Sequence, residues 1–312
     1  MPDIQNTFSW SFSAAEAFDA CPRKRYWGVY ARWGGWASGA TEIQRKAWQL
    51  SRMDTLPALR GKAVEKAVMW ALREMQAGRP ADPALAYDQI AKPYLNNCWR
   101  QSKEGLWRAD CKANCCLREH YYQQWNPGQE KEAAAGEVAK IRQCIANFMD
   151  RVWPRLKDIP PENEIPIAGP GEEFFMLHDV KINAIPDYAL RADGMIHIHD
   201  WKSGKTSESH RTQLDVYGLW AKEKHGAAPE KILLFVEYLA DGKVAAWSFS
   251  EEELQETLLR IENSVAAMTG YLEGEDRARN VPLPRDQWDL STDPDLCRNC
   301  NFYELCKPEL GF

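Results

Sequence analysis

The chain has 312 residues, of which 45% are hydrophobic and 27% charged, so it is long enough for one large globular domain or two ordinary ones. A formal net charge of −6 excludes a protein that coats nucleic acid through charge alone, because such binding depends on Lys and Arg neutralising phosphates. No apolar run is long enough to cross a bilayer and the N-terminus lacks the pattern of a signal peptide, so we expect a cytoplasmic protein that does not contact a membrane.

The elements predicted for the first half of the chain are helices. An Ala-rich run at 14–20 predicts a short helix that leads into Cys21, and Pro22 interrupts it. Residues 42 to about 155 are rich in strong helix formers and are punctuated by Pro and Gly, which indicates a succession of helices. We therefore expect an N-terminal segment at 1–40 and a mainly helical region at 41–158.

The pattern changes after the Pro-rich stretch at 159–170, and residues 159–275 are predicted to form an α/β sheet core. Short apolar-alternating runs separated by turn signals predict strands at 173–177, 180–190, 195–201, 231–239 and 244–249. Helical periodicity predicts helices at 209–225 and from 250 to about 273. An irregular segment at 276–312 ends in a cysteine cluster, and we expect the whole chain to be a single domain.

Two acids and a lysine stand on one predicted hairpin. Asp187 stands at the start of the hairpin, and Asp200 and Lys202 lie two residues apart on its second strand, so both project from one face while Trp201 points away. Two carboxylates that converge are costly unless a cation neutralises them, and hard oxygen ligands suit Mg²⁺ or Mn²⁺. A nearby lysine can position or deprotonate an attacking water and offset charge on a phosphate. By itself the Asp-x-Lys pattern also fits an ordinary surface hairpin.

In this context the arrangement resembles the PD-(D/E)XK nuclease superfamily, and within it the RecB-type branch, in which a Pro-Asp hairpin acid precedes an Asp-x-Lys strand. The resemblance implies a restriction-endonuclease-like mixed sheet flanked by helices, with a helical insertion before it. It implies hydrolysis of DNA phosphodiester bonds, with metal ligation by Asp187 and Asp200 and water activation by Lys202. Single strands or free ends are the substrates it favours, because members of the family act there.

Further marks of that branch are present. Gln213 and Tyr217 match the Gln-x-x-x-Tyr of the helix that follows, and they share one helical face. The resemblance implies that they hold DNA or orient the lysine. Upstream the branch has Gly-x-x-x-His with a metal-binding histidine, whereas this chain has Gly61 and then Glu65 at the ligand position. A carboxylate can bind the same hard cation. Glu172 and Glu173, ahead of the hairpin, are interpreted as exposed strand-end charges, with a further metal acid at one of them as the alternative.

The cysteines have the spacing of a metal site. Nine cysteines without an export signal are better interpreted as metal ligands than as disulfides, and Cys297, Cys300 and Cys306 supply three soft ligands. A closed site requires a fourth, and Cys21, followed by Pro22, is the natural one. These residues resemble the cysteine signature of iron–sulphur members of the branch, the AddAB helicase-nuclease subunits and CRISPR-adaptation nucleases, which implies a [4Fe–4S] cluster clasping the ends of the chain. Zinc on the same ligands is the alternative.

Basic and aromatic residues follow Cys21. Arg23, Lys24 and Arg25 are candidates for DNA contact. The rings after them, Tyr26, Trp27, Tyr30, Trp33 and Trp36, suit base stacking, but helical spacing favours a core position for most of them.

The sequence therefore predicts a metal-dependent DNA nuclease, acting on single strands or ends, with a helicase or a repair or defence complex as a partner. Two alternatives stay open. The fold can serve as a non-catalytic DNA-binding or scaffolding subunit, which the Glu65 departure and the acidic balance favour. The cysteines can instead bind zinc in a structural adaptor.

Overall fold

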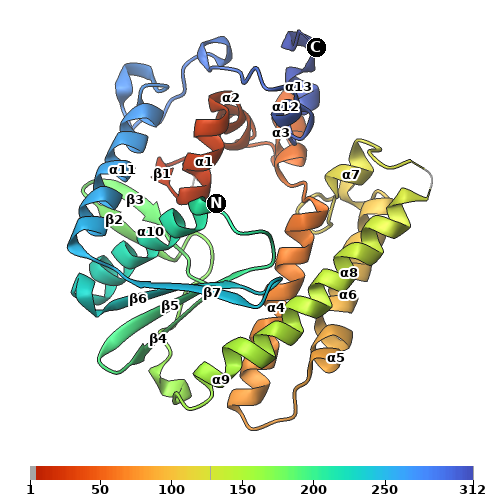
Figure 1. Cartoon of the computed structure of the whole chain (residues 1–312). Coiled ribbons are helices and arrows are strands. Elements are labelled where there is room, and N and C mark those ends of the chain that lie inside the picture. The colour runs from red at the N-terminus through yellow and green to blue at the C-terminus, as the bar shows by residue number, and fades with distance from the viewer. Residues whose placement is uncertain (1–4, 127, 312) are drawn as a thin grey trace. The chain divides into compact units, whose positions relative to one another are not determined.

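The computed structural model describes residues 5–126 and 128–311, which pack as two compact units assembled from separate segments. Unit 1 comprises residues 5–53, 174–184 and 258–311, and unit 2 comprises residues 54–173 and 185–257. Figure 1 labels their helices and strands. None of the helices among the described residues is long and apolar enough to span a membrane.

Unit 1 combines a small sheet with short helices. Its elements are β1 (Ser9–Trp10), α1 (Phe12–Ala20), α2 (Pro22–Arg25), α3 (Glu42–Ser51), β2 (Phe174–Leu177), β3 (Val180–Asn183), α12 (Pro294–Arg298) and α13 (Tyr303–Cys306). The strand order is β1-β3-β2, with β1 parallel and β2 antiparallel to β3. Helix α1 begins earlier than the run at 14–20 suggests, because the Ser11 side chain caps it by accepting a hydrogen bond from the Ala14 N–H at 3.2 Å.

Unit 2 contains the larger sheet and the long helices. Its strands are β4 (Tyr188–Ala192), β5 (Met195–Lys202), β6 (Ile232–Tyr238) and β7 (Lys243–Ser248). Its helices are α4 (Leu56–Gln76), α5 (Pro83–Ala86), α6 (Lys92–Lys103), α7 (Arg118–Tyr121), α8 (Gln129–Asn147), α9 (Trp153–Leu156) and α10 (Glu208–His225). Helix α11 (Glu251–Thr269) begins in unit 2 and ends in unit 1.

The sheet of unit 2 is mixed, as predicted. Its order is β4-β5-β6-β7, with β5 parallel to β6 and the outer pairs antiparallel. Asp193 and Gly194 form the β4–β5 turn with φ of 52° and 73°, the left-handed conformation that Asp-Gly hairpin turns require. Helix α10 crosses over between the parallel strands and packs on β5 and β6.

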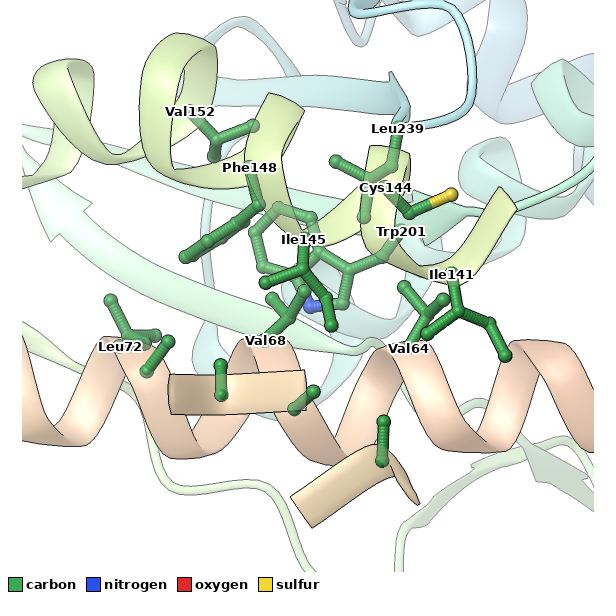
Figure 2. Packing of buried hydrophobic residues seen from close by; sticks show 14 of the residues in the cluster. Val64, Val68, Leu72, Ile141, Cys144, Ile145, Phe148, Val152, Trp201 and Leu239 are labelled. Carbon is green, nitrogen blue, oxygen red and sulfur yellow. The ribbon is translucent and has the colours of Figure 1, made fainter. Parts of the chain in front are cut away.

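The helical half of unit 2 covers one face of this sheet. Helix α4 has the cap Thr55 and then a buried stripe at helical spacing, which includes Val64, Val68 and Leu72. These side chains pack against Ile145 and Phe148, at and just beyond the end of α8, and against the Trp201 ring of β5 (Figure 2). Trp201 therefore points into this core, on the face of β5 opposite to Asp200 and Lys202.

One strand prediction is wrong. The run at 180–190 was expected to form one strand, but β3 ends at Asn183 and β4 begins at Tyr188. Pro186 lies between them and offers no N–H to a strand ladder. The two strands belong to different units, since β3 pairs with β1 and β2 whereas β4 pairs with β5.

Candidate active site

Strand β5 brings Asp200 and Lys202 together. Their positions opposite Val236 and Tyr238 of β6 place both on one face of the sheet. Asp200 is only 2% exposed, and the Nζ atom of Lys202 lies 2.6 Å from its Oδ2 as an ion pair. Among the described residues, this ion pair is the only polar contact of that oxygen. A single partner leaves part of the acceptor capacity of a buried carboxylate unused, so the site can take a further cation or donor at Asp200.

Asp187 lies beside this strand, at the start of β4. Its Oδ2 accepts a hydrogen bond from the backbone N–H of Trp201 at 2.7 Å, which fixes the carboxylate next to Asp200. Burial of the carboxyl group and the neighbouring Asp200 raise the pKa of Asp187 well above its ordinary value of 3.8. Glu65 raises this pKa further, so three acids act on one another here.

The lysine continues into a chain of hydrogen bonds on α10. Lys202 Nζ donates to Gln213 Oε1 at 2.7 Å, and Gln213 Nε2 donates to the Tyr217 hydroxyl at 2.9 Å. The helical spacing of four residues puts Gln213 and Tyr217 on one face, toward the strand. Burial and then Asp200 raise the pKa of Tyr217, so its hydroxyl stays protonated. The structure thus places both α10 residues beside the Asp200–Lys202 pair.

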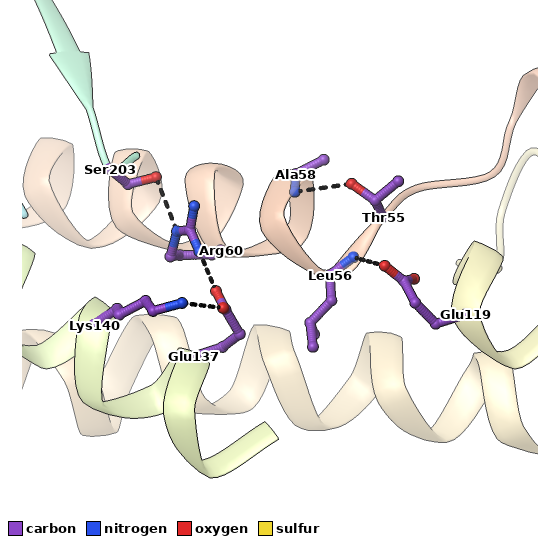
Figure 3. Close-up of polar contacts among 8 residues, drawn as sticks. All are labelled: Thr55, Leu56, Ala58, Arg60, Glu119, Glu137, Lys140 and Ser203. Carbon is purple, nitrogen blue, oxygen red and sulfur yellow. Dashed lines mark hydrogen bonds and ion pairs between the residues drawn. The ribbon is translucent and has the colours of Figure 1, made fainter. Parts of the chain in front are cut away.

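Glu65 reaches the same region from α4. Arg60, one turn before it, donates to Ser203 Oγ at 3.4 Å and forms an ion pair with Glu137 of α8 (Figure 3). This network ties α4 to the end of β5, because Ser203 directly follows Lys202. Glu65 itself is exposed, and its carboxylate raises the pKa of both Asp187 and Tyr217.

Two residues near the centre were missed from the sequence. His210 stands one turn before Gln213 on α10, and its pKa is lowered first by burial and then by Lys202. Tyr238, opposite Lys202 in β6, has a pKa that is raised by burial and lowered by Lys202. The signal for His210 was its helical spacing from Gln213 and Tyr217, which gives the three residues a common face.

A comparison with protein families decides the relationship. Residues 9–307 match the family model of the PD-(D/E)XK nuclease superfamily. The chain belongs to this superfamily. No curated protein matches it. Members of the superfamily are typically hydrolytic nucleases that commonly use Mg²⁺ or Mn²⁺, and membership implies nuclease activity with DNA as the substrate.

The acids of this chain offer carboxylate oxygens, the kind of ligand that the metal ions of the superfamily prefer. Among the described residues, no three His, Cys, Asp or Glu side chains are grouped closely enough to hold a metal ion. Mg²⁺, however, is usually held by one or two carboxylates and keeps several waters. Asp187 and Asp200 supply such a pair, and the buried Asp200 Oδ2, which the Lys202 ammonium already contacts, is an oxygen suited to a cation.

A second feature of this superfamily member is a cavity in unit 1. It measures about 80 Å³, and its lining includes Cys21, Cys297, Cys300 and Cys306. Trp27 Nε1 donates to the sulphur of Cys306 at 3.2 Å, and the Phe302 N–H donates to that of Cys300 at 3.4 Å. Burial raises the pKa of Cys306 to about 11, and Cys21 and Cys300 contribute in the same direction. The four cysteines named from the sequence therefore line one cavity.

The basic trio after Cys21 is mostly internal. Arg23 donates from Nε to the Trp288 carbonyl at 2.9 Å and forms an ion pair with Glu309, and Arg25 donates to the Ser9 carbonyl at 3.4 Å. Both arginines are buried, whereas Lys24 is half-buried and lines the cysteine cavity. DNA contact by this trio stays a prediction, and Lys24 is its most accessible member.

Glu173 is not an exposed strand-end charge. It is buried in unit 2, where its carboxylate accepts hydrogen bonds from Trp220 Nε1 and the Ala168 N–H, both at 2.7 Å, and pairs with Lys224. These partners occupy both carboxylate oxygens. The sequence interpretation was wrong on exposure, because neighbouring residues give no sign of distant partners.

Proposed function

We propose that this protein is a metal-dependent deoxyribonuclease of the RecB type. Its active centre, formed by Asp187, Asp200 and Lys202, hydrolyses the phosphodiester bonds of DNA. The observation that carries the proposal is the convergence of two acids whose charges oppose one another, beside a lysine held by an ion pair and a glutamine. A bound cation relieves such repulsion, and carboxyl groups with strongly shifted pKa values gather at functional sites.

Each residue has a proposed role. Asp187 and Asp200 would hold Mg²⁺ or Mn²⁺, with Glu65 completing the set from α4, and the bound cation would polarise the phosphate and lower the pKa of a water. Lys202 has three donors, of which Asp200 and Gln213 orient two, so the third is available to an attacking water or a phosphate oxygen. Gln213 and Tyr217 keep that ammonium group in place.

The proposed substrates are single-stranded DNA or free ends, and the proposed setting is a repair or defence complex that includes a helicase. The resemblance to RecB-type exonucleases supports both. A strand that has been unwound exposes its backbone to a centre placed at the end of β5.

The test compares the wild type with Lys202→Ala on single-stranded, double-stranded and end-blocked DNA in the presence of Mg²⁺ or Mn²⁺. We expect cleavage of open single strands by the wild type and its loss, by about 100-fold or more, in the variant. Lys205→Ala is the matched control, since Lys205 is an exposed lysine three residues further on. Equal cleavage by the wild type and by Lys202→Ala would contradict the proposed active centre.

We further propose that the cysteine cavity holds a [4Fe–4S] cluster. Four thiols around one cavity supply the ligands that such a cluster requires, and the N–H groups of Trp27 and Phe302 donate to two of the sulphurs, as around protein-bound clusters. Iron and sulphide in the purified protein, with broad absorption near about 400 nm, are expected. Stoichiometric zinc without iron would contradict the cluster and favour the structural zinc alternative.

A further inference from the structure

A group of tryptophans lies at the surface of unit 1, in and after the turn that precedes α3. The Trp33 and Trp36 rings meet edge-on with centroids 5.1 Å apart, and Trp36 meets Trp48 of α3 at 5.2 Å. Trp36 is 46% exposed, whereas Trp27 and Tyr30 of the same segment are buried. The core therefore accounts for the earlier rings of this run and leaves Trp36 unexplained.

Two arginines flank this group. The guanidinium of Arg32 lies 5.7 Å and that of Arg52 5.4 Å from the centroid of the Trp48 ring. Among the described residues, neither arginine has an ion-pair partner, and the Nε of Arg32 is buried without a hydrogen bond. Burial and then the charge of Arg52 lower the pKa of Arg32, so the two cations oppose one another. An anion between them would relieve that repulsion.

The surface is held in shape by its contact with α3. Gln44 Nε2 donates to the Trp33 carbonyl at 3.1 Å, and Arg32 donates to Ser51 Oγ at 3.3 Å. Gly35 permits this approach, because a Cβ there would come within 2.4 Å of the Gln44 carbonyl oxygen. A site that is rigid before binding loses less entropy when a ligand arrives.

We propose that Arg32, Trp33, Trp36, Trp48 and Arg52, here called the Trp36 surface, bind single-stranded nucleic acid. A base stacks on Trp36, and a phosphate lies between Arg32 and Arg52. An exposed ring beside guanidinium groups that lack an ion-pair partner among the described residues matches the two parts of a nucleotide, and every base offers a face for stacking. A duplex fits less well because its bases are already stacked. The choice of DNA as the strand rests on the proposed nuclease function. The proposal that this surface binds a single strand does not depend on that function.

Binding is measured by fluorescence anisotropy with a labelled oligothymidine of about 20 nucleotides. This strand is longer than the roughly 4–16 nucleotides that one OB-fold, a common single-strand-binding domain, covers. The protein carries Lys202→Ala and the buffer contains EDTA, so the strand is not cut. Trp36→Ala should weaken binding by about 5- to 100-fold. Leu259→Ala, another exposed apolar residue of unit 1, is the control and should leave binding unchanged. A strand of ribothymidine run in parallel keeps the same base and shows whether the sugar matters.

An abasic strand with the same phosphates separates stacking from charge. If Trp36 stacks on bases, Trp36→Ala has no effect on this strand. Arg52→Gln should weaken the binding of both strands and reduce the slope of log affinity against log salt by about one. Arg79→Gln removes the same charge from an exposed ion pair with Glu74 and should leave binding and its salt slope unchanged.

The outcomes are distinguishable from those of the nuclease test. Trp36-dependent binding by a protein that cuts no DNA would support this surface and overturn the nuclease proposal. Cleavage by wild type, together with equal binding of oligothymidine by Trp36→Ala and its parent, would overturn the surface alone. An equal loss on the abasic strand would also overturn it, because stacking requires a base. Unchanged far-UV circular dichroism, which reports on the backbone rather than on the deleted ring, establishes that each variant is folded.

Discussion

The acids of unit 2 and the thiols of unit 1 are both candidate metal sites, yet the fold holds them differently. Asp200 and Lys202 stand on a central strand paired on both sides, and Asp187 is hydrogen-bonded to the backbone of that strand. The cysteines come from the end of α1 and from the short helices and turns near the C-terminus. Backbone pairing therefore positions the acids, whereas the thiols lie on elements that no strand pairing holds.

This difference has opposite consequences for stability. The acids repel one another, and the fold maintains that repulsion at a cost, as functional centres commonly do. A bound cluster would instead link the two ends of unit 1 and restrict its unfolded chain. Substituting one metal-binding side chain should therefore reduce charge repulsion in unit 2. In unit 1 the same kind of substitution should lower the free energy of unfolding.

The largest expected effect is that of Asp187→Asn. The amide oxygen can still accept the Trp201 N–H, while the charge that opposes Asp200 is lost. We expect cleavage to fall by about 10²- to 10⁴-fold. Without divalent cations, the free energy of unfolding should stay equal or rise. Denaturant titration in EDTA, alongside cleavage assays in Mg²⁺, measures both, and a clear loss of stability would refute the account of unit 2.

The next effect is that of Cys297→Ser in unit 1. Cys297 lines the cavity with the three other cysteines, so its loss should release iron and lower the stability of unit 1 by on the order of 3 kcal/mol, comparable to removing a cross-link. Hydrogen exchange of peptides from each unit, together with iron analysis, locates the change. Cys144→Ser is the control, because Cys144 is a buried thiol in the core of unit 2. Retained iron and unchanged exchange in Cys297→Ser would contradict the cluster.

The parts of the site that follow from local spacing could be predicted from the sequence. Strand period puts Asp200 and Lys202 on one face, and helical period puts Gln213 beside Tyr217, whatever surrounds them. The burial of Arg23 could not be predicted, because it depends on the Trp288 carbonyl and Glu309, far away in the chain. The division into two units was missed for a similar reason, since partner strands rather than local pattern decide where β3 ends and β4 begins.

The smallest expected effect is a difference in acid sensitivity between the units. Burial lowers the pKa of five histidines below the ordinary value of 6.5, and all five lie in unit 2: His120, His197, His199, His210 and His225. As the pH falls through 6.5, the unfolded chain takes up protons at these positions before the folded chain does. Stability contributed by the neutral histidines is therefore present above this pH and lost below it.

Asp187 acts in the opposite direction, because its raised pKa lets the folded chain bind a proton that the unfolded chain releases. Between pH 7.5 and 5.5 we expect unit 2 to lose on the order of 1 kcal/mol, since most of these histidines are partly exposed and solvent screens them. Asp187→Asn removes the opposing contribution, so its loss should be steeper than that of the wild type. Hydrogen exchange at both pH values, corrected for the intrinsic exchange rate, reports on each unit. The described segments of unit 1 contain one histidine, the exposed His178. An equal or greater loss of stability in unit 1 would therefore contradict this assignment.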